Sequence, residues 1–64
     1  MAAELIFGTE KLVVDPGVTI EHAMISAGKH PDAFLFLLDG KPVPMTTVLH
    51  DGIRIEALRV ASGG

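Results

Sequence analysis

Hydrophobic residues alternate with polar ones at the start of the chain in a pattern typical of two β-strands. In residues 3–7 every second side chain is apolar and falls on one face, while the opposite face is only partly apolar. Residues 11–15 are rich in β-branched side chains, which strands favour. Residues 8–10 begin with glycine and predict a tight turn. We therefore predict an N-terminal hairpin that ends at Asp15-Pro16-Gly17, where proline fixes φ and glycine permits a reversal.

The next segment has the period of a helix. Its apolar side chains repeat at spacings of three and four residues and so share one face. These positions are Ile20, Ala23, Met24 and Ala27. Thr19 is the predicted N-cap, because its hydroxyl can accept a hydrogen bond from a free N–H of the first turn. Gly28 is the predicted C′ residue, and Pro31 prevents continuation, so we predict a short helix over residues 20–27.

Residues 33–38 are apolar on both faces, as expected for a strand inside a sheet with one face under the helix. Asp39-Gly40 is a strong signal for a hairpin turn. Residues 41–44 contain two prolines, which cannot donate to a hydrogen-bond ladder, so this segment can only be a short edge strand.

The last third of the chain predicts a loop followed by one more strand. Residues 45–50 are expected to form the loop, and Asp51-Gly52 a turn. Residues 53–60 alternate again, and we expect one set of side chains to face the core. That core set is Ile53, Ile55 and Ala57, and the opposite set is Arg54, Glu56, Leu58 and Val60.

The predicted order is strand, strand, helix and then three strands. One helix must then cover one face of a mixed sheet, with the first and last strands side by side in its middle. This order predicts an α+β protein, a β-grasp (ubiquitin-like) roll. We expect residues 1–60 to form the domain and residues 61–64 a flexible C-terminal tail that ends in Gly-Gly.

Composition narrows the classes of function. The chain has 64 residues, a formal net charge of −3 and no cysteine, which excludes disulfides, thiolate zinc sites and cysteine nucleophiles. So short a chain cannot build both a core and a deep substrate pocket, so we expect a carrier or binding module without a cofactor, not an enzyme. Its basic residues are scattered, and no Tyr or Trp is present to stack bases, which argues against nucleic-acid binding.

The sequence also lacks the signals of a membrane span, a signal peptide or a metal-binding motif. No apolar run approaches the roughly 20 residues that cross a bilayer, and the start lacks the basic residues of a signal peptide. We therefore expect a cytoplasmic protein without a membrane partner. His22, His30 and His50 do not have the spacing of a known ligand motif, so we interpret them as surface or capping residues and predict no metal site.

Three segments together resemble a known family. They are the hairpin Asp39-Gly40-Lys41-Pro42-Val43-Pro44, the entry into the last strand at residues 48–55, and the terminal Ser62-Gly63-Gly64. This combination resembles the prokaryotic β-grasp sulfur carriers (ThiS/MoaD-like) of thiamine and molybdopterin synthesis, and the archaeal ubiquitin-like small modifiers. The resemblance covers essentially the whole chain, but the small, uncharged Ala61-Ser62 departs from the basic tails of eukaryotic ubiquitin-like proteins.

The tail has the properties that such a role requires. A terminal carboxylate is ionised at neutral pH, and residues without bulky side chains can enter a narrow channel. Four residues reach at most about 14 Å. The resemblance implies that an E1-like enzyme uses ATP to adenylate Gly64, next to Gly63, and that sulfur then converts the acyl-adenylate to a thiocarboxylate. This product would supply sulfur for thiamine, molybdopterin or tRNA thiolation, through a sulfur donor and a sulfur-accepting enzyme.

Two alternatives remain open. The same activation could end in an isopeptide bond to lysines of target proteins, and the tail could instead be inert on a passive interaction domain. If the protein forms chains, its own lysines could accept the bond. These are Lys11, Lys29 and Lys41.

Docking of the activating enzyme requires an accessible surface beside the tail. Leu58 and Val60 are apolar residues on a mixed strand face, and such a patch often marks a partner site, although single exposed apolar residues are also ordinary. Leu35, Leu37 or Val13 could extend the patch, and Arg59 could support the tail. The predicted docking residues are Leu58, Arg59, Val60, Ala61 and Ser62, on a protein expected to be monomeric.

Overall fold

A computed structural model describes residues 2–60 of the chain. Its elements are β1 (Ala3–Phe7), β2 (Glu10–Val14), α1 (Ile20–Ser26), the 3-10 helix η1 (Pro31–Ala33), β3 (Phe34–Leu38), β4 (Lys41–Val43) and β5 (Arg54–Arg59). The five strands form one sheet in the order β2-β1-β5-β3-β4. The predicted order of strands and helix is therefore confirmed.

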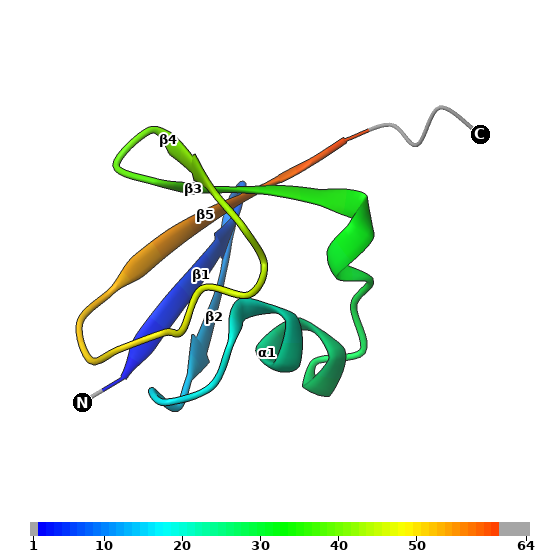
Figure 1. Cartoon of the computed structure of the whole chain (residues 1–64). Coiled ribbons are helices and arrows are strands. Elements are labelled where there is room, and N and C mark those ends of the chain that lie inside the picture. The colour runs from blue at the N-terminus through cyan, green and yellow to red at the C-terminus, as the bar shows by residue number, and fades with distance from the viewer. Residues whose placement is uncertain (1, 61–64) are drawn as a thin grey trace.

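The sheet is mixed because its first and last strands run in the same direction. β1 pairs with β5 in parallel, whereas β1–β2, β3–β4 and β3–β5 are antiparallel. Figure 1 shows α1 lying across one side of this sheet, with β1 and β5 in its middle. The sequence-based expectation that the two terminal strands lie side by side is confirmed.

Both ends of α1 are stabilised by the residues predicted for them. The Thr19 hydroxyl accepts a hydrogen bond from the backbone N–H of His22 at 3.1 Å. Gly28 has a φ of +76°, a left-handed conformation that suits glycine. The N–H groups of Gly28 and Lys29 donate to the carbonyls of Ile25 and Met24, both at 2.9 Å, which is the bond pattern of a Schellman motif. The helix ends at Ser26, one residue before the predicted boundary.

Two boundaries in the first half differ from the prediction. β2 covers Glu10–Val14 instead of residues 11–15, because Glu10 pairs directly with Phe7 across a two-residue turn. The 3-10 helix Pro31–Ala33 was not predicted, and it removes Ala33 from the strand predicted over residues 33–38. The proline that blocks the longer helix is here the first residue of this short helical turn.

The later strands are shorter than predicted. β4 ends at Val43 and so leaves out Pro44, and β5 covers Arg54–Arg59 instead of residues 53–60. Val60 follows β5 without a ladder partner, but its N–H donates to the carbonyl of Ala33 at 2.9 Å. The predicted hairpin turn at Asp39-Gly40 is confirmed, since both residues have positive φ.

The core lies between α1 and the sheet. Ile53, Ile55 and Ala57 are buried there, as the alternation in the last strand predicted. Among residues 2–60 the buried core cluster consists of Ala3, Leu5, Ile20, Ala23, Met24, Phe36, Leu49, Ile53, Ile55 and Ala57. Leu49 is fully buried although it belongs to a loop.

The loop before β5 lies against the start of α1 and completes the fold there. Residues Thr19 and Val48 form an isolated antiparallel bridge. The N–H groups of Ile20 and Glu21, which have no partner within a helix, donate to the carbonyls of Thr47 and Met45 at 3.0 Å. The loop therefore supplies the acceptors that the helix N-terminus needs.

Within residues 2–60 no helix is both long and apolar enough to cross a bilayer.

Candidate docking face beside the tail

The tail continues from the central region of the sheet. β5 lies between β1 and β3, and the described chain ends one residue beyond it at Val60. The hydrogen bond from Val60 to Ala33 ties this point to the turn before β3. Four of the predicted site residues lie outside the described residues: Ala61, Ser62, Gly63 and Gly64. Their role stays a prediction.

An apolar pair lies just before this attachment point, on the sheet face away from α1. Leu58 of β5 and Leu35 of β3 are register partners and are 45% and 41% exposed. Side chains directly opposite each other on adjacent strands are in contact distance, so these two form one surface. Val60 is also exposed, and Leu37 is half-buried two residues along β3. The structure therefore places Leu58 and Leu35 together near the end of β5, two residues before the last described residue, Val60.

Val13 does not join this apolar pair. Val13 on β2 is the register partner of Glu4 on β1, which in turn pairs with Arg54 on β5. These three residues form a row across the outer face of the sheet, and two of them, Glu4 and Arg54, are charged. The docking patch that the alternation predicted is therefore split, with Val13 separated from Leu58 by an ion-pair network.

Glu4 is the centre of that network. Its Oε1 accepts a hydrogen bond from Nε of Arg54 at 3.1 Å, and its Oε2 lies 3.4 Å from Nζ of Lys11. The hydrogen bond from Arg54, together with the charge of Lys11, lowers the pKa of the Glu4 carboxyl below its usual value. The alternation in the last strand placed Arg54 on the face opposite the core, and it lies there. Glu4 was missed because its partners lie on β2 and β5, which only the strand order brings beside it.

A cavity of about 380 Å³ lies at the end of β5, where Ala57, Leu58 and Arg59 contribute to its lining. Phe7, Phe34 and Arg59 contribute to its lining, and the ammonium of Lys29 lies 4.8 Å from the centre of the Phe7 ring. The rings of Phe7 and Phe34 meet edge to face at 5.5 Å. Arg59 and Lys29 thus place two positive charges near the start of the tail.

The three lysines have different surroundings. Lys11 is engaged with Glu4, and Lys29 with the Phe7 ring. Lys41 is exposed at the start of β4, with no ion pair or ring contact recorded within residues 2–60. Lys11 and Lys41 are thus both exposed, and they differ in that Lys11 has an ion-pair partner.

The histidines lie apart from these surfaces. His22, His30 and His50 are all exposed. Across the described part of the chain, no group of three or more His, Cys, Asp or Glu side chains could hold a metal ion.

Comparison with known proteins gives a structural match. No family model matches the chain, and no curated protein sequence matches it. A solved structure of ubiquitin from Caldiarchaeum subterraneum superposes with a TM-score of 0.64 at 17% sequence identity. The match covers 100% of this chain and 98% of that one. With a five-stranded sheet and one α-helix within residues 2–60, the protein therefore has the ubiquitin-like β-grasp fold.

Proposed function

We propose that this protein is a ubiquitin-like carrier or modifier that an E1-like enzyme activates at Gly64. The observation that carries the proposal is that the segment ending in Gly-Gly directly follows the last strand of the fold, β5. The central strand β5 leads, five residues after Arg59, to the final glycine of a sequence that ends in Gly63-Gly64. A body of this fold can dock outside an enzyme while a small-residue tail enters its active site.

Sulfur carriage is the first form of the proposal. The carboxylate of Gly64 attacks the α-phosphate of ATP and displaces pyrophosphate, which gives an acyl-adenylate. Hydrosulfide supplied by a sulfur donor then attacks the carbonyl and displaces AMP, which leaves a thiocarboxylate with no change of oxidation state. The chain has no cysteine, so sulfur that it carries by this route sits on its own carboxyl group.

Intact mass spectrometry tests this form directly. The protein is incubated with an E1-like enzyme from its own host, ATP and a sulfur donor, and we expect one oxygen of Gly64 to be replaced by sulfur. The matched control lacks Gly63 and Gly64 and should show neither this replacement nor pyrophosphate exchange. An unchanged mass and no exchange in the complete chain would contradict the proposal.

Conjugation to lysines is the second form, and the similarity to an archaeal ubiquitin favours it. Here a lysine amine attacks the carbonyl of the acyl-adenylate, AMP leaves with the breaking of the acyl–phosphate bond, and an isopeptide bond forms. Trypsin cleaves after Arg59 and would leave a Val-Ala-Ser-Gly-Gly remnant on the target lysine. We expect this remnant in digests of host proteins, and its absence from every host lysine would remove this form.

The same deletion separates both forms from a passive interaction domain. If the tail is inert, removing Gly63 and Gly64 leaves partner binding and host phenotype unchanged. If the tail is activated, the deletion abolishes adenylation, although it leaves in place every buried core residue from Ala3 to Ala57.

A further inference from the structure

Two aromatic rings lie on the side of the sheet that carries α1 and are only partly buried. Side chains along a strand alternate between the two faces, so Phe7 shares the face of buried Leu5, and Phe34 shares that of buried Phe36. The rings of Phe7 and Phe34 meet edge to face at 5.5 Å. Aromatic surface therefore stays accessible at the end of these strands.

A small residue lies between the strands that carry these rings. Ala57 of β5 lines the cavity of about 380 Å³ together with Phe7 of β1 and Phe34 of β3, and β5 is the strand between β1 and β3. Its methyl group fills little of the space beside the two rings. The volume of the cavity falls in the range of sites that bind small molecules, and it is sufficient for one aromatic side chain of a partner.

Two cations without a carboxylate partner border this cavity. The protein has five Lys and Arg residues, and two of them are already paired with Glu4. Lys29 and Arg59 both line the cavity, and no ion pair is recorded for either of them in the part of the chain that the structure describes. The ammonium of Lys29 lies 4.8 Å from the centre of the Phe7 ring. The cavity therefore combines aromatic surface with two positive charges.

One carboxylate also lines the cavity. Glu10 is the register partner of Phe7 and is exposed at the start of β2. Among the described residues no ion pair joins it to Lys29 or Arg59, so it does not neutralise either cation directly. Two cations and one anion leave a positive balance here, on a protein whose net charge is −3. An anionic ligand is therefore favoured over a cationic one.

We propose that this cavity binds a segment of a partner protein in which Asp or Glu flanks an aromatic side chain. The aromatic ring of the segment enters beside Phe7 and Phe34, because aromatic pairs gain from stacked and edge-to-face contacts. The flanking carboxylates meet Lys29 and Arg59. The proposal rests on the α1 side of the sheet and does not depend on activation at Gly64.

Three synthetic peptides probe the cavity. The first is N-acetyl Gly-Asp-Phe-Asp-Gly amide, the second has Asn in place of both Asp residues, and the third has Ala in place of Phe. Each is titrated into the isotope-labelled full chain and followed by amide NMR. We expect the first peptide to shift the amides of Phe7, Lys29, Phe34 and Arg59, and to bind about fivefold more tightly than either control peptide.

Variants test each charge separately. Arg59→Glu and Lys29→Glu should each remove the preference for the Asp peptide over the Asn peptide. Lys41→Glu makes the same charge change on an exposed residue of β4 and should leave the preference intact. Glu10→Gln removes the opposing carboxylate and should strengthen binding of the Asp peptide alone. If Lys29→Glu does not fold, the variants at the exposed residues Arg59 and Glu10 still decide.

Several results would overturn the proposal. Absence of saturable binding, equal binding of the Asp and Asn peptides, or shifts centred on Leu35 would each exclude the cavity as a site for such a segment. Equal shifts with inorganic phosphate alone would assign it to a free anion. Concentration-dependent shifts without any peptide would assign it to a second copy of this chain, and binding that appears only after removal of Gly63 and Gly64 would assign it to the chain's own end.

Discussion

Gly28 is a residue whose role rests on backbone conformation alone. Its φ is +76°, and a Cβ added there would have no atom within 4 Å. A clash is therefore absent, and the cost of a side chain comes from the left-handed conformation, about 1 kcal/mol. We expect Gly28→Ala to lower the free energy of unfolding by about that amount, measured by denaturant titration. Asn tolerates this conformation better, so Gly28→Asn should cost less, and equal losses would contradict this explanation.

Glu4 makes the stability of the protein depend on pH. Because its pKa is lower in the folded chain than the ordinary value of 4.5, the ion pairs stabilise the fold above that value. This stabilisation is lost as the pH falls through the folded pKa. We expect Glu4→Gln to lower the melting temperature at pH 7, and the difference from the parent chain to vanish in acid. Glu21→Gln is the control, and a difference for Glu4→Gln that persists in acid would refute an electrostatic origin.

Among the elements, the loop before β5 contributes more to stability than its lack of regular structure suggests. Leu49 is fully buried, whereas the neighbouring Val48 is 52% exposed. We expect Leu49→Ala to cost about 2–5 kcal/mol, enough to unfold a marginal small domain, and Val48→Ala to cost under about 0.5 kcal/mol. Thermal unfolding followed by circular dichroism compares the two variants. Similar losses at both positions would show that the loop does not anchor through Leu49.

Elements with local signals were predictable from the sequence. Both caps of α1 were predictable, because Thr19 and Gly28 act within a few residues of the helix ends. The 3-10 helix was not, because Pro31 signals a break equally well for several kinds of turn. The N–H of Leu49 donates to the carbonyl of Val18, and the carbonyl of Leu49 accepts from the N–H of Gly17, both at 2.7 Å. These partners lie far away in sequence, so no local pattern indicated the burial of Leu49.

At the scale of the whole molecule, the proposed activation predicts that substitutions on the outer sheet face and on the helix side affect adenylation unequally. Leu58 lies beside the tail on the outer sheet face, whereas Ile25 is 60% exposed on α1. We expect Leu58→Arg to lower kcat/KM for adenylation by the E1-like enzyme about tenfold, because a buried contact of the complex is lost. Ile25→Arg adds the same charge on the helix side and should have little effect. Equal effects would exclude the Leu58 surface as the docking site.

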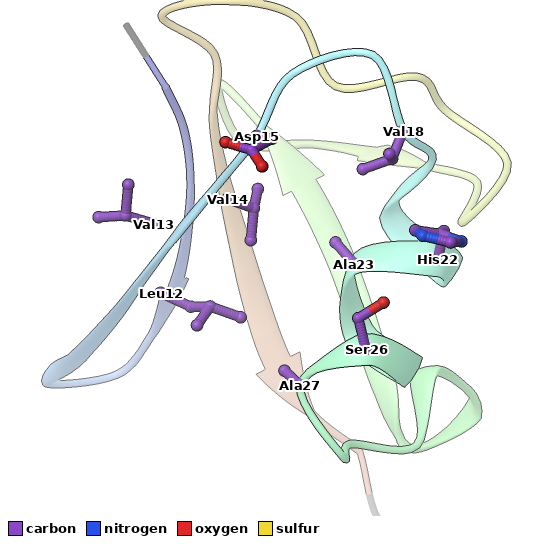
Figure 2. Close-up of a pocket in the computed structure, with 9 residues that line it drawn as sticks. All are labelled: Leu12, Val13, Val14, Asp15, Val18, His22, Ala23, Ser26 and Ala27. Atoms are coloured by element: carbon purple, nitrogen blue, oxygen red, sulfur yellow. The ribbon is translucent and has the colours of Figure 1, made fainter.

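The candidate surfaces were only partly predictable because they depend on the strand order. Alternation placed Leu58 and Leu35 on outward faces, but their contact follows from the pairing of β5 with β3. Alternation placed Val13 on an outward face as well, but the strand order separates Val13 from Leu58 and Leu35. A groove of about 330 Å³ between β2 and α1 left no pattern in the sequence, because Leu12 and Val14 on one side and the small residues Ala23, Ser26 and Ala27 on the other meet only in the fold (Figure 2).

The parallel pairing of β1 with β5 also determines how the protein responds to mechanical force. Glu4, Leu5 and Ile6 lie in register with Arg54, Ile55 and Glu56, and the two strands run in the same direction. A pull applied at residues 3 and 59 in opposite directions therefore acts along both strands. The hydrogen bonds between them are loaded together in shear instead of being opened one after another. A force that an enzyme applied to the tail would act along β5, which is hydrogen-bonded to β1 on one side and to β3 on the other.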